Sequence, residues 1–136
     1  MIRGTLLLAV SLFAFSVAPA NASCAQGSVA GVWKLYAAVS NVSGETDWNK
    51  CSATIAVNGK LSAASCQNSQ GGSTPVTGQV SLSNAANCTY TGTIHQTLTG
   101  ITDTINEATL SIDKRSASGV GKYSGGGFVF TMVKVR

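Results

Sequence analysis

Apolar and polar residues alternate with a period of two along most of the chain. In 76–82 and again in 87–96, every second position is apolar or small and the positions between carry mainly Thr, Ser or Gln. This period is typical of a strand with one buried and one exposed face. Clusters of Gly, Asn and Ser interrupt the pattern at short intervals. The expected strands are 31–39, 51–57, 61–66, 76–82, 87–96, 108–112, 119–123 and 127–135.

About eight short strands with short connections predict an all-β fold, an antiparallel up-and-down meander closed into a round or flattened barrel. The same pattern permits an open β-sandwich. An eight-stranded outer-membrane barrel is a third option, but Gly and Thr occupy many positions that would face lipid, and aromatic girdles are missing. In 101–107 the apolar face shifts by one residue, which indicates a short helix or a bulge.

Residues 1–22 have the features of a secretory signal peptide. A basic residue precedes an almost wholly apolar stretch over 5–17, and Ala-Asn-Ala at 20–22 is a small-x-small cleavage site. The apolar stretch is shorter than the ~20 residues of a membrane-spanning helix. We therefore expect a secreted or periplasmic protein that does not span the membrane after cleavage, with one β-barrel domain over 23–136.

The four cysteines lie in the exported part and predict two disulfides. Asn58-Gly59 favours a two-residue type I′ turn, which would place Cys51 opposite Cys66 on neighbouring strands, within reach of a disulfide. A bulge would shift this register. Cys24 and Cys88 then form the second pair. The alternative, Cys24 with Cys51 and Cys66 with Cys88, stays open.

The charge is low and dispersed. Nine Lys and Arg less Arg3 of the leader leave eight basic residues against five Asp and Glu, a net charge of +3 with the histidine neutral. Only Lys114 and Arg115 are adjacent, whereas nucleic-acid binding needs clustered cations. We expect no nucleic-acid partner.

Few side chains are suited to catalysis. His95 is the only histidine, and it shares a strand face with three threonines, which favours a surface position. Glu45 and Asp47 lie beside Trp48 in a polar segment typical of a solvated loop. The chain has no hydrolase, zinc-protease or phosphate-loop motif and no CxxC. We expect no enzyme activity, no metal and no cofactor.

The expected interior is poor in bulky side chains, because many strand positions hold Ala, Gly or Ser. An eight-stranded barrel must fill its interior, enclose a ligand cavity or flatten. A cavity would hold a small apolar or amphipathic ligand. The aromatic residues that we expect to contact it are Tyr36, Trp48, Tyr90, Phe128 and Phe130, with Trp48 either folded over the core or lining the barrel mouth.

Gly31-Val32-Trp33, on the first expected strand, resembles the Gly-x-Trp signature of the calycin superfamily. These are the lipocalins, fatty-acid-binding proteins, avidins and small periplasmic metalloprotease inhibitors. The resemblance implies an antiparallel barrel in which Trp33 plugs one end beneath a basic side chain of the last strand, here Lys134 or Arg136. It implies the architecture and no set of binding residues.

Two functions are compatible with these patterns. The first is an exported binding protein that holds a small ligand inside a calycin-like barrel. The second is a cell-envelope structural or interaction protein, or a protease inhibitor, that acts through its outer face or a loop such as 44–48. A cavity lined by aromatic residues favours the first, and a filled interior with an exposed apolar patch favours the second.

Overall fold

A computed structural model describes residues 23–136, so the predicted signal peptide, 1–22, lies outside the described residues. The described part begins with a 3-10 helix, η1 (Gln26–Val29). Its strands are β1 (Gly31–Asn41), β2 (Thr46–Ile55), β3 (Leu61–Asn68), β4 (Ser73–Asn84), β5 (Thr89–Gln96), β6 (Thr102–Leu110), β7 (Ser116–Tyr123) and β8 (Gly126–Lys134). No helix of 23–136 has the length and apolarity needed to cross a bilayer.

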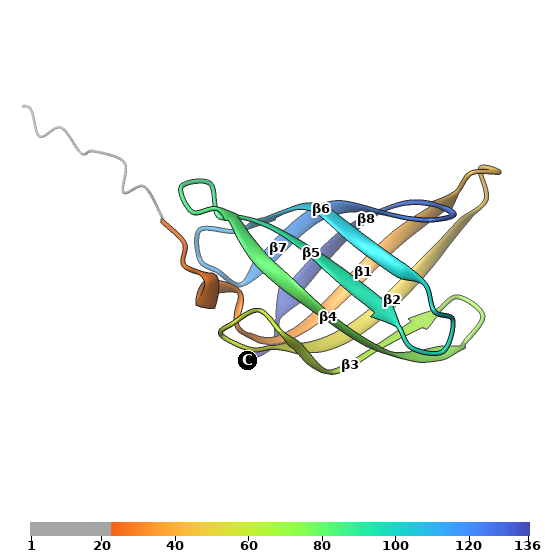
Figure 1. The fold of residues 1–136 in the computed structure, drawn as a ribbon, viewed down its shortest axis with the longest axis horizontal. Coiled ribbons are helices and arrows are strands. Elements are labelled where there is room, and N and C mark those ends of the chain that lie inside the picture. The colour runs from red at the N-terminus through yellow and green to blue at the C-terminus, as the bar shows by residue number, and fades with distance from the viewer. Residues whose placement is uncertain (1–22) are drawn as a thin grey trace, which may run out of the picture.

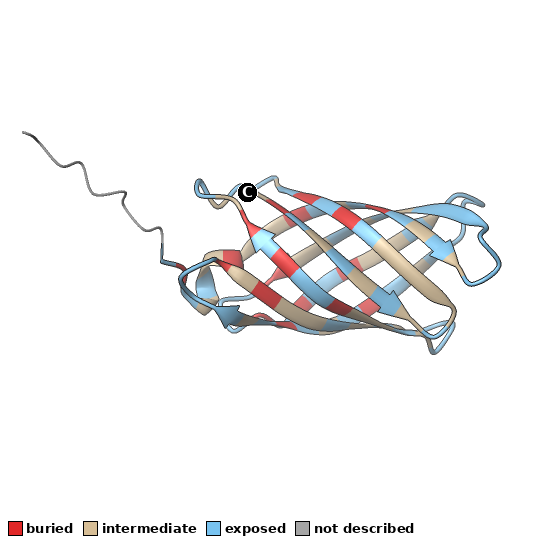
Figure 2. Ribbon diagram, turned by 90° about the horizontal axis from the view of Figure 1, so that it is seen from above, coloured by how far each residue is buried: buried red, intermediate tan, exposed pale blue. Residues whose placement is uncertain are grey.

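Each strand pairs antiparallel with the next, and β8 pairs with β1, so the sheet closes into a barrel (Figure 1). The all-β up-and-down prediction is confirmed, and the open sandwich is wrong. Buried and exposed residues alternate along the strands, as a barrel wall with one inner and one outer face requires (Figure 2).

The number of paired positions differs from one pair of neighbouring strands to the next. β3 and β4 pair at four positions, fewer than any other neighbours, with one further isolated bridge between Lys60 and Gln79.

Three successive hairpins are built on the same turn. In the hairpins after β1, β2 and β3, three residues lie between the two residues that close the hairpin with a backbone hydrogen bond. The third of them is Gly44, Gly59 or Gly71, with φ of 81°, 85° and 82°. Glycine adopts this left-handed conformation without the steric penalty of a Cβ atom. In three-residue hairpin loops, a residue with this conformation follows a tight turn. The predicted two-residue turn at Asn58-Gly59 is therefore wrong, because the hairpin closes one residue further out, between Ala56 and Lys60.

A bulge restores the register that the longer turn shifts. Near the turn Ile55 pairs with Leu61, one residue out of the predicted alignment. Beyond the turn β3 holds one residue more than β2, at Ala63, whose φ is 44°. The two shifts cancel, so Cys51 lies opposite Cys66 as predicted.

Both predicted disulfides are present, so the alternative pairing is wrong. Cys51 and Cys66 join β2 to β3 across a Cα distance of 4.0 Å. Cys24 and Cys88, 64 residues apart in the chain, join the N-terminal segment to the end of the β4–β5 loop. The shift of the apolar face in 101–107 is also explained, since β6 carries a bulge between Ile105 and Glu107 rather than a helix.

The segment before β1 seals one end of the barrel. Trp33 is almost fully buried there, and its Nε1 donates a hydrogen bond of 2.7 Å to the carbonyl of Val29 in η1. The Lys134 Nζ lies 5.0 Å from the centroid of the Trp33 ring and 3.4 Å from the carbonyl oxygen of Ser28. Of the two basic residues considered for this position, Lys134 covers the indole. Arg136 contributes its backbone carbonyl, which accepts a bond from β1.

The side chain of Gln26 fixes η1 to β4. Its Nε2 donates to the Val80 carbonyl at 2.9 Å, and its Oε1 accepts from the Leu82 amide at 2.6 Å. The Tyr90 hydroxyl donates to the Ala25 carbonyl at 2.8 Å. These bonds satisfy backbone groups that a barrel end would otherwise leave unpaired, and with the Cys24 disulfide they hold the seal in place.

Candidate ligand cavity

The interior of the barrel is not filled. A cavity of about 460 Å³, a volume typical of small-molecule sites, runs along its axis, lined by residues from all eight strands. Trp33 and Val29 close one end. At the other end the lining includes Leu98 and Thr99 of the exposed β5–β6 loop, so the cavity opens there.

Two phenylalanine rings lie along the wall of the cavity. Phe128 pairs with Gly121 across β7 and β8, and Phe130 pairs with Gly119. A Cβ on Gly119 would come within 2.7 Å of the Phe130 ring, and one on Gly121 would overlap the Phe128 ring. The rings therefore occupy the space that larger side chains would need, an arrangement known to stabilise glycine in sheets. The ring centroids are 6.0 Å apart.

Small side chains elsewhere in the wall leave further room. The alanines on the inner face are Ala37, Ala53, Ala108 and Ala117, contributed by four different strands. The shortage of bulky inward residues seen in the sequence thus corresponds to a cavity, not to a filled or flattened interior. Much of the remaining lining is aliphatic or aromatic, so the walls favour an apolar molecule.

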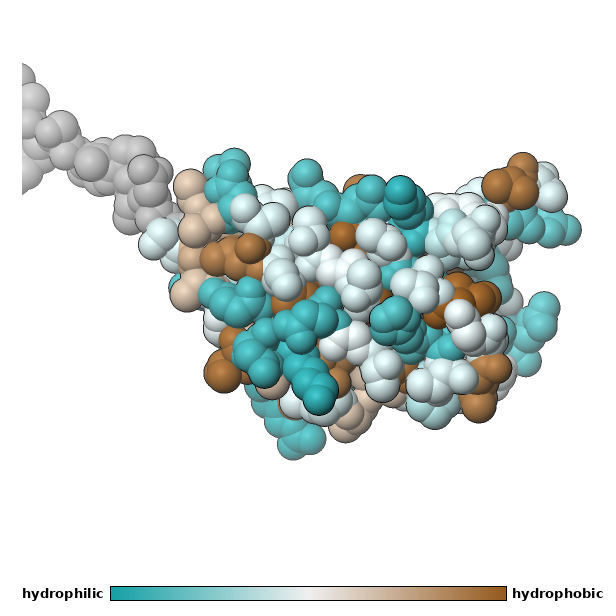
Figure 3. Space-filling view, viewed as in Figure 1, coloured by the Kyte–Doolittle hydropathy of each residue, from teal (hydrophilic) through white to brown (hydrophobic). Residues whose placement is uncertain are grey.

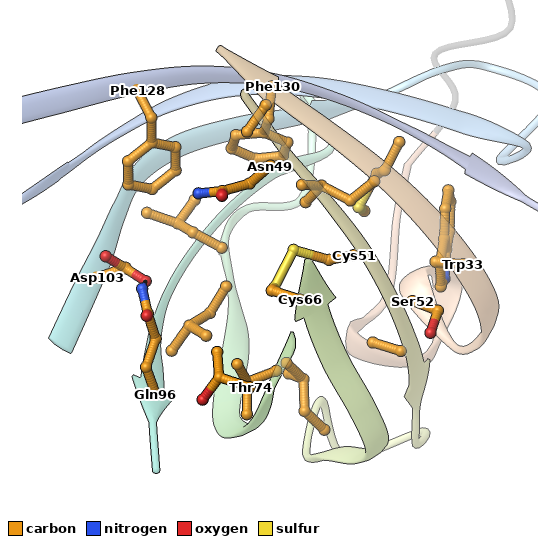
Figure 4. A pocket seen from close by; sticks show the side chains of 18 of the residues that line it. Trp33, Asn49, Cys51, Ser52, Cys66, Thr74, Gln96, Asp103, Phe128 and Phe130 are labelled. Carbon is orange, nitrogen blue, oxygen red and sulfur yellow. Dashed lines mark hydrogen bonds between the residues drawn. A yellow bond between two sulfur atoms is a disulfide. The ribbon is translucent and has the colours of Figure 1, made fainter. Parts of the chain in front are cut away.

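A polar cluster stands inside this apolar lining toward the open end. Asp103 on β6 is half-buried, and Gln96 on β5 donates from its Nε2 to the Asp103 Oδ2 at 2.9 Å. Figure 4 shows the Asp103 and Gln96 side chains facing each other, and Asn49 is a further polar residue of the lining. Burial raises the pKa of the Asp103 carboxyl, and the bond from Gln96 offsets part of that rise.

The other carboxylate in the lining is Asp47, at the mouth. It is exposed, and its pKa is lowered by a hydrogen bond from the Ser69 side chain and by one from the Trp48 backbone. No lysine, arginine or histidine is among the lining residues that the structure describes. The charge inside the cavity is therefore negative.

The disulfide between Cys51 and Cys66 also lines the cavity, and Figure 4 shows it in the wall between Trp33 and the polar cluster. The same figure shows that the side chains of Cys51 and Cys66 project inward from β2 and β3. The disulfide therefore contributes an apolar, rigid surface to the site as well as holding the two strands together.

The structure brings together three of the five aromatic residues predicted to contact a ligand. Phe128 and Phe130 line the middle of the cavity, and Tyr90 lines it near the sealed end. Tyr36 and Trp48 are each 50% exposed and lie outside the cavity, so their predicted placement is wrong. Each side chain follows the alternation of its own strand, which points it away from the lumen.

Outside the barrel, Trp48 and Tyr36 contribute to a strip of outer surface. Cross-strand pairing aligns Trp48, Ala38, Val129 and Val120 over β2, β1, β8 and β7. The face over β3 to β6 instead mixes polar and apolar side chains (Figure 3). His95 is also exposed, with its Nδ1 2.9 Å from the Thr102 hydroxyl, so it takes no part in the cavity.

Sequence reasoning missed Asp103, Gln96 and Asn49. A signal for Asp103 was present, since it lies two residues from both Ile101 and Ile105 and so shares their inward face. An acid on an apolar strand face marks a buried polar site. Within 23–136 no group of three or more His, Cys, Asp or Glu side chains is arranged to hold a metal ion.

No known protein family matches the chain, and neither does any curated protein. Among the solved structures that share its fold are two eight-stranded barrels. One is a redesigned β-barrel, b11L5F_LGL, with a TM-score of 0.59 and 18% identity over 84% of this chain and 99% of that one. The other is EF1p2_mFAP2b bound to DFHBI, with a TM-score of 0.60 and 15% identity over 84% of this chain and 98% of that one. At these identities the chain is similar to them in fold alone, as a closed eight-stranded antiparallel barrel.

Proposed function

We propose that this is an exported binding protein that holds a small, mostly apolar ligand in the barrel. The observation that carries the proposal is the cavity of about 460 Å³, sealed at one end and open at the other. A similar barrel, EF1p2_mFAP2b, is bound to DFHBI, which supports a small molecule as the ligand of this fold. The two disulfides suit an oxidising extracellular or periplasmic compartment.

The protein binds its ligand rather than transforming it. The cavity lining of the described residues carries no histidine, and neither cysteine in it is free because both form a disulfide. The second function considered from the sequence, interaction through the outer surface, was expected with a filled interior and an exposed apolar patch. The outer strip of Trp48, Val129 and Val120 meets the second condition, but the interior is not filled. An unfilled interior favours the binding protein.

Native mass spectrometry of the protein purified from its own compartment tests for a captured ligand. The expected result is extra mass that disappears on denaturation. Titration with Nile red, a neutral apolar dye, provides a second readout that does not need the natural ligand. Wild-type protein is expected to enhance the dye's fluorescence on binding.

A pair of neighbouring substitutions on β1 locates the site. Ala37 lines the cavity, so Ala37→Leu fills part of it and is expected to weaken Nile red binding at least tenfold, about 1.4 kcal/mol. Ala38 is exposed on the outer wall, so Ala38→Leu is the matched control and is expected to bind like wild type. Equal dye binding by wild type and Ala37→Leu, or no captured ligand together with no dye binding, would overturn the proposal.

A further inference from the structure

The carboxylate of Asp103 has an unusual position for a charged group. It lies in the wall of an apolar cavity, on the same strand face as Ile101 and Ile105, and opposite Ile94 in the neighbouring strand. The hydrogen bond from Gln96 supplies one donor but no positive charge. A carboxylate held in such surroundings is destabilised unless a cation approaches it.

The cavity-lining residues of 23–136 include no cationic side chain. All the ionisable side chains in the lining are acids or phenols: Asp47, Asp103, Tyr90 and Tyr123. Asp47 is also negative and stands at the mouth, where it adds to the negative potential that an entering molecule meets. A positive partner for Asp103 must therefore come from the ligand.

We propose, resting on the binding function above, that the cavity selects hydrophobic amines, with the ammonium group of the ligand paired to Asp103 and its apolar part lying toward Trp33. The distribution of groups along the cavity sets this orientation. Asp103 and Gln96 lie toward the open end, while the Cys51–Cys66 disulfide and Trp33 line the deeper part. A charge pair in this partly dry site is stronger than the same pair in water.

The same arrangement disfavours acidic amphiphiles. A fatty acid would place its carboxylate near Asp103 and Asp47, with no lysine or arginine of the described lining to neutralise it. A neutral alcohol of the same chain length gains the apolar contacts without the charge pair. The expected order of affinity is therefore amine, then alcohol, then carboxylate.

Displacement of Nile red by decylamine, decan-1-ol and decanoate at pH 7, each below its micelle concentration, tests this order. In wild type we expect decylamine to bind at least tenfold more tightly than decan-1-ol, and decanoate at least tenfold more weakly. Asp103→Asn keeps the shape and the bond to Gln96 but removes the charge. It is expected to lose the preference for decylamine over decan-1-ol.

Asp47→Asn is the matched control, because it removes a carboxylate that is exposed at the mouth rather than half-buried in the wall. This variant is expected to retain most of the preference for decylamine over decan-1-ol. Equal affinities for the three compounds in wild type, or an undiminished amine preference in Asp103→Asn, would overturn the amine assignment while leaving the binding function intact. Failure of Nile red and all three compounds to bind would instead contradict the binding function itself.

Discussion

At the residue scale, Asp103 illustrates a conflict between stability and binding. A carboxylate in an apolar wall lowers the stability of the empty barrel, yet the same position gives a ligand its polar contact. Such conflicts between fold and function are expected at binding sites. In most of the wall the sequence follows the rules of a stable barrel, and Asp103 departs from them.

The pH dependence of stability tests this account. Because burial raises the folded-state pKa of Asp103 above 3.8, its stabilising contribution is present below pH 3.8 and is lost as pH rises through the folded pKa. No lysine, arginine or histidine is among the cavity-lining residues of 23–136, so no cation of the described lining offsets this rise. Asp103→Asn is therefore expected to melt at a higher temperature than ligand-free wild type at pH 7, with a smaller difference at pH 3.

Asp113→Asn is expected to change the stability at pH 7 in the opposite direction to Asp103→Asn. The pKa of Asp113 is lowered, chiefly by a hydrogen bond from the Ser111 hydroxyl, so its contribution is present above pH 3.8 and is lost as pH falls. This substitution is expected to lower the melting temperature at pH 7. Thermal denaturation followed by circular dichroism distinguishes the two. A lower melting temperature for Asp103→Asn at pH 7 would contradict the burial argument.

Gly121 is a second residue whose identity shapes the cavity. In Gly121→Ala the new Cβ would overlap the Phe128 ring, so the ring must turn away from the wall into the lumen. We expect a loss of about 1 to 3 kcal/mol in unfolding free energy, as is usual for overpacking, and weaker Nile red binding. Urea denaturation and dye titration measure the two effects.

Gly127→Ala is the control for this substitution. Gly127 lies next to Phe128 on β8, but a Cβ there meets only the Gly121 carbonyl oxygen, at 3.4 Å. It is expected to have the smaller effect on both measurements. If Gly121→Ala binds the dye as tightly as Gly127→Ala, the ring does not depend on the glycine for its position.

At the scale of elements, the two disulfides contribute differently. Closing a 64-residue loop constrains the unfolded chain more than closing a 15-residue loop, by the chain-entropy argument about 4 against about 3 kcal/mol. The double variant Cys24→Ser, Cys88→Ser is therefore expected to lose more stability in urea than Cys51→Ser, Cys66→Ser. Loss of the Cys24–Cys88 bond also leaves η1 held to β4 by the hydrogen bonds of Gln26 without a covalent link. The reverse order would show that the cavity-wall disulfide does more than constrain the unfolded chain.

The sequence predicted the order of the elements better than their ends. Alternation identified the eight strands because each has one apolar face, but β6 begins at Thr102, earlier than predicted, since its bulge breaks the period. β2 also begins earlier, at Thr46, because the strands extend beyond the core and line the mouth with polar residues. The compensating bulge at Ala63 had no signal in the sequence, since nothing about an alanine indicates a positive φ.

At the scale of the whole molecule, the barrel has a fixed end and an accessible end. Hydrogen exchange of the ligand-free protein is expected to be slowest at the amides of the sealed end, such as Val32 and Leu82, and fastest in the loops around the mouth. Addition of decylamine is expected to slow exchange mainly in 96–103, beside the polar cluster. Protection confined to the outer surface of β1 and β8 would place the ligand outside the barrel.

The uneven pairing around the barrel has a mechanical consequence. β3 holds β4 at only four paired positions, whereas its other neighbour, β2, is joined to it by a covalent bond between sulfur atoms. Under load we expect β3 to move together with β2 and the wall to part between β3 and β4. Separation is expected to begin in the unpaired stretch between Val76 and the Lys60–Gln79 bridge, while the disulfide keeps β2 and β3 together.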